Sequence, residues 1–345
     1  MKHVPALDGV RGLAITLVML DHTLARVPAL QGQPWLDFLW SGVDLFFVLS
    51  GFLITGILLD AQGDPHYFRT FYARRVLRIC PLYYSFLVGF FLVAVCLPGR
   101  PDMAWLLRHQ GWFWCFGANL LIAFNSGFLP HLNPFWTLAV EEHFYLFWPW
   151  IVARANPVRL AVGAAVASLL VLLGRCLLVH FYGSQPAFVV LTPLRLDALL
   201  CGAILQVAVR TSARTFVVCR MLFVGGGLVL ATALMCHVPV HLLAPAVQAV
   251  GFTLIALFYT GLMGEALGGA SRFKGFFEQS WLRFLGRHAY GLYVVHVPVI
   301  EGLSAYLSGE EVAVLAWAVS LGIAWASYRW LESPFLRLKP AFSRG

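Results

Sequence analysis

Long runs of apolar residues alternate with short polar breaks along the whole chain. A helix that crosses a bilayer needs roughly 20 mostly apolar residues, and ten stretches of about that length follow one another. They predict membrane-crossing helices at residues 7–27, 36–61, 74–98, 135–154, 158–182, 190–210, 217–237, 241–263, 285–307 and 311–333. The pattern therefore predicts an all-α integral membrane protein, with about ten transmembrane helices in one bundle.

One stretch, from Arg100 to Pro134, does not fit this pattern. It holds Trp105, Trp112, Trp114 and Phe116 among polar residues. Aromatic side chains mixed with polar ones are typical of a segment at the membrane surface. We therefore interpret it as interfacial or re-entrant, although an eleventh crossing stays open.

Composition supports a membrane environment and a single domain. Of the 345 residues, 60% are hydrophobic and only 12% charged, and the mean hydropathy is +0.78. This leaves too little polar surface for a water-soluble globule of this length. We expect one transmembrane domain over residues 1–334 and a short cytoplasmic tail over 335–345.

The distribution of Lys and Arg predicts the orientation, because cationic loops stay on the cytoplasmic side. With both termini placed inside, only Arg26, Arg100 and Arg108 fall outside, and three further arginines fall within spans. The other 18 of the 24 basic residues are then cytoplasmic. This asymmetry predicts two cytoplasmic termini, and it explains the net charge of +8 without nucleic-acid binding.

Polar residues inside apolar spans cost several kcal/mol unless they are paired or hydrated, and each is a candidate for function. They are Arg11, His22, Asp44, Ser50, Glu141, Glu142, His143, Tyr145, Arg195, Asp197 and His296. At 1.5 Å per residue, His22, Asp44 and Glu141 all fall roughly 8 to 12 Å below the outer surface. Tyr145, Asp197 and His296 fall at a similar depth or slightly deeper. We therefore expect these groups to line one cavity.

Each of these residues also has a structural interpretation. Buried carboxylates and arginines pair in many bundles, and for Arg195 with Asp197 a purely structural pair is as well supported as a site. His22 is a stronger candidate for chemistry, because carboxylates at the same depth could orient it and tune it as a base. We expect no metal site, since the seven cysteines form no C-x-x-C pair. His237 and His241 have i, i+4 spacing, but Pro239 lies between them in a predicted outer loop, so chance explains their spacing better.

A pair of arginines, Arg75 and Arg78, marks the inner end of the third predicted span. They are i, i+3 neighbours, so two guanidinium groups lie side by side where they could hold a phosphate bidentately. Anchoring to lipid headgroups at the inner surface explains the same pattern equally well when this segment is taken alone.

Several blocks, taken in order, resemble the acyltransferase 3 family of membrane acyltransferases. They are LDGVRGLA at residues 7–14 with His22, GVDLFFVLSGF at 42–52, the R-x-x-R of Arg75 and Arg78, WTLAVEEHFY at 136–145, YGLYVVHVP at 290–298 and WLESP at 330–334. Blocks spread over most of the chain make the resemblance specific. One departure is His143, where the family often has Gln.

The resemblance implies a bacterial inner-membrane O-acyltransferase. Such an enzyme moves an acyl group, often acetyl, from cytoplasmic acyl-CoA to a hydroxyl of a surface polysaccharide, lipopolysaccharide, peptidoglycan or other glycoside. By similarity, Arg75 and Arg78 hold the CoA phosphates, and His22 acts as general base or transient acyl carrier, oriented by Asp44 and Glu141. Acyl-CoA is then a co-substrate, and no permanently bound cofactor is expected.

Two other classes of protein fit the same pattern of buried charges. A transporter or flippase for a glycan or glycolipid also needs polar groups within its spans and a basic cytoplasmic face. A purely structural membrane subunit is a more distant alternative. The acceptor, the acyl chain length and the oligomeric state are left open by the sequence.

Overall fold

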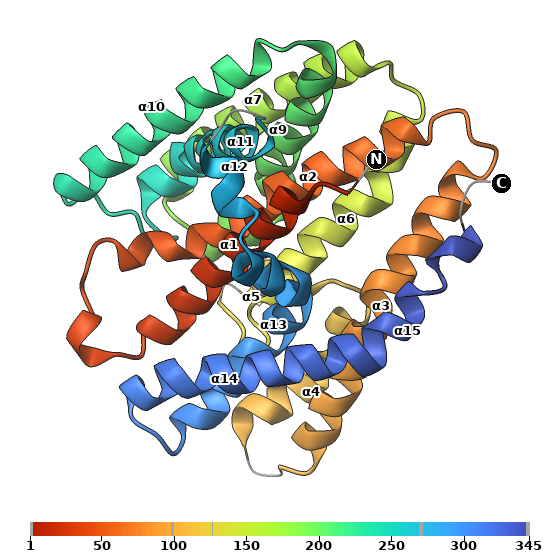
Figure 1. Ribbon diagram of the computed structural model, residues 1–345. Helices are drawn as coiled ribbons and strands as arrows, with labels where there is room; N and C mark the ends of the chain where they lie inside the picture. Colours follow the sequence, from red (N-terminus) through yellow and green to blue (C-terminus); the bar gives the residue numbers. More distant parts are fainter. Residues whose placement is uncertain (1–2, 98–99, 126, 269–271, 343–345) are drawn as a thin grey trace.

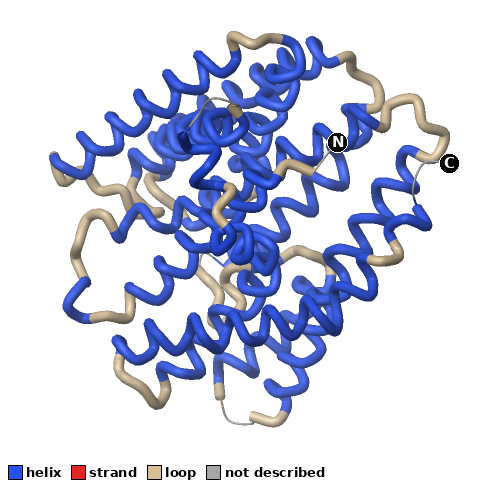
Figure 2. The backbone as a smooth tube through the Cα atoms, in the orientation of Figure 1, coloured by secondary structure: helices blue, strands red, loops and turns tan. Residues whose placement is uncertain are grey.

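The computed structural model describes residues 3–97, 100–125, 127–268 and 272–342, and these residues form helices joined by loops (Figure 2). The helices up to residue 182 are α1 (Pro5–Leu24), η1 (Pro28–Leu30), η2 (Leu36–Ser41), α2 (Gly42–Asp60), α3 (Tyr67–Val95), α4 (Pro101–Trp114), α5 (Ala118–Asn125), α6 (Phe135–Val152) and α7 (Pro157–Tyr182). After them come α8 (Pro186–Val190), α9 (Thr192–Thr211), α10 (Thr215–Met235), η3 (Val247–Gly251), α11 (Phe252–Leu267), α12 (Arg272–Phe277), α13 (Ser280–Ser304), α14 (Gly309–Ser327), η4 (Tyr328–Glu332), α15 (Ser333–Leu336) and η5 (Lys339–Phe342).

Local sequence signals explain where several helices begin. Helix α7 starts after Asn156, whose side chain accepts a hydrogen bond of 2.8 Å from the backbone N–H of Arg159. Helix α14 starts with a capping box formed by Ser308 and Glu311. Such caps satisfy N–H groups that have no partner within the helix. Helix α1 instead has a proline, Pro5, in its first turn, where a missing N–H costs nothing.

Helices cover all ten predicted spans, and among the described residues seven segments are long and apolar enough to cross a membrane. These seven are Leu36–Asp60, Tyr67–Val95, Pro157–Tyr182, Pro186–Thr211, Thr215–Met235, Val247–Leu267 and Gly309–Leu336. The chain is thus a multi-pass helical membrane protein. Helices α1, α6 and α13 fall outside this set and carry Arg11, Glu141 and His296 among other polar residues. The count of ten and the side of the termini stay predictions. Of the predicted tail, residues 343–345 lie outside the described residues.

Two short helices, α4 and α5, occupy the Trp-rich stretch. Helix α4 has 14 residues, a length of about 21 Å at 1.5 Å per residue, which is less than the roughly 30 Å of a bilayer core. Asp102 of α4 contacts Nε2 of His131 at 2.8 Å, and Nδ1 of His131 contacts Glu301 of α13. His131 has a left-handed backbone, with a φ of 57°. One histidine therefore ties this stretch to α13 through two carboxylates.

Glycines allow the central helices to pack closely. A methyl group on Gly12 of α1 would overlap the carbonyl of Leu282 in α13, and one on Gly51 of α2 would overlap the carbonyl of Leu199 in α9. Small residues are the usual means of bringing membrane helices together. Figure 1 shows α7, α9, α10 and α11 gathered on one side of α1 and α2, and α3, α4, α14 and α15 on the other.

Candidate active site

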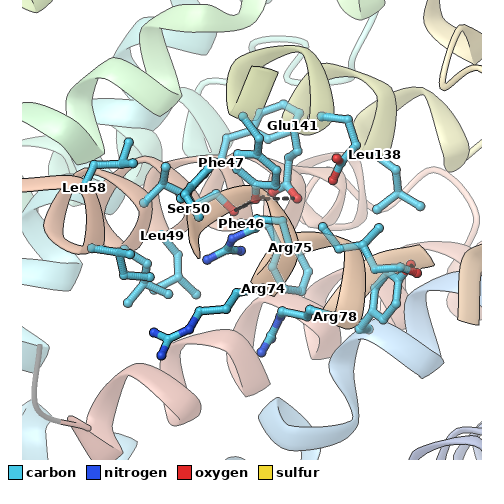
Figure 3. Close-up of a pocket in the computed structure, with 18 of the residues that line it drawn as sticks. Phe46, Phe47, Leu49, Ser50, Leu58, Arg74, Arg75, Arg78, Leu138 and Glu141 are labelled. Carbon is cyan, nitrogen blue, oxygen red and sulfur yellow. Dashed lines mark hydrogen bonds between the residues drawn. The ribbon is translucent and has the colours of Figure 1, made fainter. Parts of the chain in front are cut away.

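A cavity of about 710 Å³ lies among helices α1, α2, α3, α6 and α13. It combines an apolar wall, which includes Phe46, Leu49 and Leu138, with a set of charged side chains from α3 and α6 (Figure 3). Concave sites of this size, with a few converging polar groups in an apolar lining, are typical of small-molecule binding. This cavity is therefore the candidate site.

A network of three residues joins α2 to α6 in the cavity wall. Ser50 donates a hydrogen bond of 2.6 Å to Oε1 of Glu141, and the hydroxyl of Tyr145 lies 3.1 Å from both Oε2 of Glu141 and Oγ of Ser50. The sequence placed Glu141 and Tyr145 one helical turn apart, and this contact is confirmed. The carboxylate of Glu141 is thus held by two hydroxyl groups inside an apolar region, which fixes its position.

Three arginines of α3 project into the cavity, and Arg75 is the nearest of them to the Ser50–Glu141 bond (Figure 3). Its guanidinium carbon lies 5.2 Å from the ring centre of Tyr145 and 5.8 Å from that of Phe71. Among the described residues, no acidic side chain lies within 4.0 Å of the guanidinium nitrogens of Arg74, Arg75 or Arg78. Their donors therefore stay available for an anion.

The depth of these arginines differs from the prediction. Helix α3 begins at Tyr67 rather than at residue 74, and it continues through Pro81. The arginines consequently lie about two turns inside the helix, where they face the cavity instead of ending a span. The sequence missed this because residues 67–73 mix aromatic and polar side chains and do not extend the apolar run.

One cation of the cavity lies far from α3 in the sequence. Lys339 of η5 lines the cavity together with the arginines. Burial, followed by the positive charges of Arg78, Arg75 and Arg74, lowers the pKa of Lys339 to about 7. No pattern in the sequence pointed to this residue, because it stands beyond the last apolar span in a short basic segment.

His22 lies outside the cavity, three turns along α1 from Arg11, which lines it. The Nδ1 atom of His22 lies 3.0 Å from the carbonyl oxygen of Val18. A carbonyl oxygen only accepts, so Nδ1 carries the proton and Nε2 keeps a free lone pair in the neutral ring. The nearest acidic oxygen is Oδ2 of Asp21, at 3.6 Å from Nδ1. The tautomer with the proton on Nδ1 and a lone pair on Nε2 is the one that a base or nucleophile needs.

The second histidine, His296, contacts the first. The ring centres of His22 and His296 are 4.9 Å apart at nearly a right angle. Nδ1 of His296 lies 2.8 Å from the carbonyl oxygen of Tyr293, and its buried Nε2 has no hydrogen-bond partner among the described residues. Tyr293 lines the cavity, and its ring centre is 5.6 Å from that of His296. Tyr293 and His296 thus connect the cavity to His22 by direct contact.

Asp44 and Arg195 form a fully buried ion pair of 2.7 Å outside the cavity. Arg195 also lies over the ring of Phe252, at 3.8 Å from the ring centre. Asp197 instead pairs with Arg175 at 2.8 Å. The structural pair considered for Arg195 and Asp197 is therefore not formed, because each residue has another partner. The family resemblance implies that Asp44 orients His22, but Asp44 pairs with Arg195. Glu141 likewise binds Ser50 and Tyr145, and no described contact joins it to His22.

The structure therefore divides the predicted site residues into two groups. Seven of them line the cavity: Arg11, Ser50, Arg75, Arg78, Glu141, Glu142 and Tyr145. The remaining four do not: His22, Asp44, Arg195 and His296. The single cavity expected from the depth of these residues is thus two neighbouring features, a charged cavity and a histidine pair. His143, the departure from the family pattern, contacts Thr192 at 2.8 Å and lies outside both.

Comparison with known proteins assigns the chain to a family. A family profile described as an acyltransferase domain, that of the acyltransferase 3 family, matches residues 4–329. The chain belongs to the acyltransferase 3 family. It is similar to the O-acetyltransferase OatA of Staphylococcus aureus (strain NCTC 8325 / PS 47), with 26% identity over 366 residues that cover 96% of this chain and 57% of that protein.

Two further relatives have similar names and similar coverage. The peptidoglycan O-acetyltransferase OatA of Listeria monocytogenes is 27% identical, over 96% of this chain and 56% of its own length. A putative O-acetyltransferase of Staphylococcus aureus (strain COL) is 24% identical, over 97% of this chain and 58% of its own length. The chain thus spans a little over half the length of these relatives. No solved structure matches it.

Proposed function

We propose that this member of the acyltransferase 3 family is an O-acyltransferase of the bacterial inner membrane. It transfers an acyl group, in the simplest case acetyl, from cytoplasmic acyl-CoA to a hydroxyl of a cell-surface carbohydrate. The observation that carries the proposal is the cavity, in which Arg74, Arg75 and Arg78 have no acidic partner within 4.0 Å among the described residues. Guanidinium groups bind phosphate bidentately, and CoA carries several phosphates.

The histidine pair supports the chemical step. As general base, Nε2 of His22 accepts the proton of the acceptor hydroxyl while its oxygen attacks the thioester carbonyl, and the CoA thiolate leaves and is then protonated. As acyl carrier, the same lone pair attacks the thioester first and expels the CoA thiolate, which is then protonated. The acceptor hydroxyl then attacks the acyl group on the ring, releases the neutral imidazole and loses its proton to solvent. In both cases the carboxylate of Asp21 would stabilise the positive ring that forms.

The separation of the two features fits a donor with a long flexible arm. Arg11 and His22 are 11 residues apart on α1, which is about 16 Å at 1.5 Å per residue. In the proposed complex the phosphates lie with the arginines and the pantetheine arm runs past Tyr293 towards His296 and His22. The named function of the Listeria relative supports a cell-wall carbohydrate as acceptor.

Replacing His22 tests this proposal. We expect His22→Ala to lower acyl transfer by at least about 100-fold, the usual size of a general-base contribution, and more if His22 carries the acyl group. The measurement is O-acetylation of surface glycans, followed by mass spectrometry in cells that produce equal amounts of membrane-inserted protein. The exposed His180 at the end of α7 provides the matched control, and His180→Ala should leave the rate unchanged.

Two results would contradict the proposal. One is a correctly inserted His22→Ala protein that acylates its acceptor at the parental rate. The other is transport of a glycan by the purified protein in vesicles that contain no acyl-CoA, since this would support the transporter alternative instead.

A further inference from the structure

The C-terminal segment returns to the cavity after the last long helix. Helices η4, α15 and η5 follow α14 and pack along α3, and Figure 1 shows α15 beside that helix. This places Lys339, the first residue of η5, in the cavity lining with the arginines. A residue just beyond the last family motif thus becomes part of the charged wall.

The cavity lining holds more positive than negative charge. Its cations are Arg11, Arg74, Arg75, Arg78 and Lys339, and its carboxylates are Asp60, Glu141 and Glu142. Asp60 contacts Arg210 at 2.8 Å, so part of its charge is already balanced from α9. Glu141 is held by the two hydroxyl groups described above, and Arg11 contacts Asp8 at 3.2 Å. The positive charges of the lining that are not balanced in this way favour binding of an anion.

Lys339 is the cation of the cavity whose protonation depends on these neighbouring charges. It has no hydrogen bond or ion pair among the described residues, and it is partly buried. Four arginines, Arg78, Arg75, Arg74 and Arg11, repel its positive charge. The carboxylate of Glu332 in η4 interacts electrostatically with Arg78. Near neutral pH this lysine therefore exchanges between the charged and neutral forms. An anion bound among the arginines would cancel the repulsion and favour the charged form.

We propose that Lys339 is a donor-binding residue, which contacts a phosphate of the donor bound in the cavity and takes up one proton from solvent as that phosphate arrives. This inference rests on the proposed function, because it takes a soluble phosphate-bearing donor as the ligand. The neutral amine gains a proton and becomes an ammonium group that donates to the phosphate oxygen. Donor affinity is therefore coupled to pH through a residue outside the family motifs.

Binding of CoA to the full-length protein in phosphatidylcholine nanodiscs tests the coupling. Between pH 7 and 9 the phosphates stay fully ionised, since their second pKa is about 6, so the protein supplies the pH dependence. We expect the dissociation constant of the parental protein to rise with pH, by up to about tenfold per unit. Calorimetry in buffers of different ionisation enthalpy should show uptake of up to one proton at pH 8.

Three variants separate Lys339 from its surroundings. Lys339→Arg keeps the charge but does not titrate in this range, so it should bind CoA tightly without the pH slope. Lys339→Gln should bind about tenfold more weakly at pH 6.5, also without the slope. The exposed Arg337 lies two residues away, and Arg337→Gln should behave as the parental protein.

The outcomes distinguish this inference from the proposed function. If CoA binds and Arg75→Gln weakens binding, but Lys339→Gln keeps the parental affinity and pH slope, the role of Lys339 is wrong and the function stands. If CoA does not bind, the proposed function itself fails. If nanodiscs with phosphatidylglycerol remove the slope and block CoA binding, the phosphate that Lys339 contacts belongs to a lipid headgroup and the donor assignment is overturned.

Discussion

The buried ion pair between Asp44 and Arg195 offers a test of which polar residues hold the bundle together. Their side chains are 0% and 1% exposed and meet at 2.7 Å. Oδ2 of Asp44 and both Nε and Nη1 of Arg195 have no hydrogen-bond partner among the described residues. The pair is therefore only partly satisfied, and it lies outside the cavity. We expect it to serve packing of α2 against α9 rather than chemistry.

Removing one partner should cost much more than removing both. Arg195→Met leaves Asp44 as a buried charge without its partner, which costs about 3–5 kcal/mol, and it also removes the contact with the ring of Phe252, worth up to about 2 kcal/mol. The double variant Asp44→Leu with Arg195→Met replaces both charges by apolar groups. Because replaced pairs are often neutral or better, the double variant should be more stable than Arg195→Met by about 2 kcal/mol or more.

Reversible unfolding in mixed detergent micelles measures this difference for the parental protein, the two single variants and the double variant. The reasoning is refuted if Arg195→Met costs less than about 1 kcal/mol, or if the losses of the single variants simply add. Acyl transfer by the double variant is the second readout. A double variant that folds but has lost activity would show that the pair takes part in the reaction.

Two further predictions concern the close packing at Gly51 and the contact between His131 and Asp102. Gly51→Ala should destabilise the protein by about 1–3 kcal/mol, because the added methyl group meets the carbonyl of Leu199. Gly89→Ala is the control and should not destabilise it, because a methyl group there meets no atom within 4 Å. Thermal unfolding compares the two variants, and equal melting temperatures would contradict close packing at Gly51. The hydrogen bond from His131, followed by Arg100, lowers the pKa of Asp102 below its usual value. The stability that Asp102 contributes is then fully present above its unfolded pKa of about 3.9 and is lost as the pH falls below that value. His131→Gln should therefore flatten the fall in melting temperature between pH 5 and 3. An unchanged profile would count against the contact between His131 and Asp102.

Spacing along a single helix predicted the parts of the site that depend on one helix alone. Glu141 and Tyr145 meet one turn apart, and Arg75 and Arg78 face the same cavity, because the helical repeat fixes which residues share a face. The long apolar runs also predicted a helix at each of the ten spans. These are local consequences of the sequence.

Partners contributed by different helices were not predictable in this way. The depth of a residue along its helix says nothing about the direction in which the helix is rotated, so Asp44 could be placed level with His22 and yet point to Arg195. The carboxylate beside His22 proved to be its neighbour Asp21. Lys339 was missed for a related reason, since only the path of the C-terminal segment brings it to the cavity.

The most direct test of the account is transfer of labelled acetyl from acetyl-CoA by the purified protein in proteoliposomes, with a glycan acceptor on the opposite side. The account predicts transfer by the parental protein, loss of most of it at low donor concentration when Arg75 and Arg78 are both replaced by Gln, and no change in Arg159→Gln, an exposed arginine outside the cavity. Full transfer by the protein that lacks both arginines, with an unchanged KM for acetyl-CoA, would contradict the central claim that this cavity holds the donor.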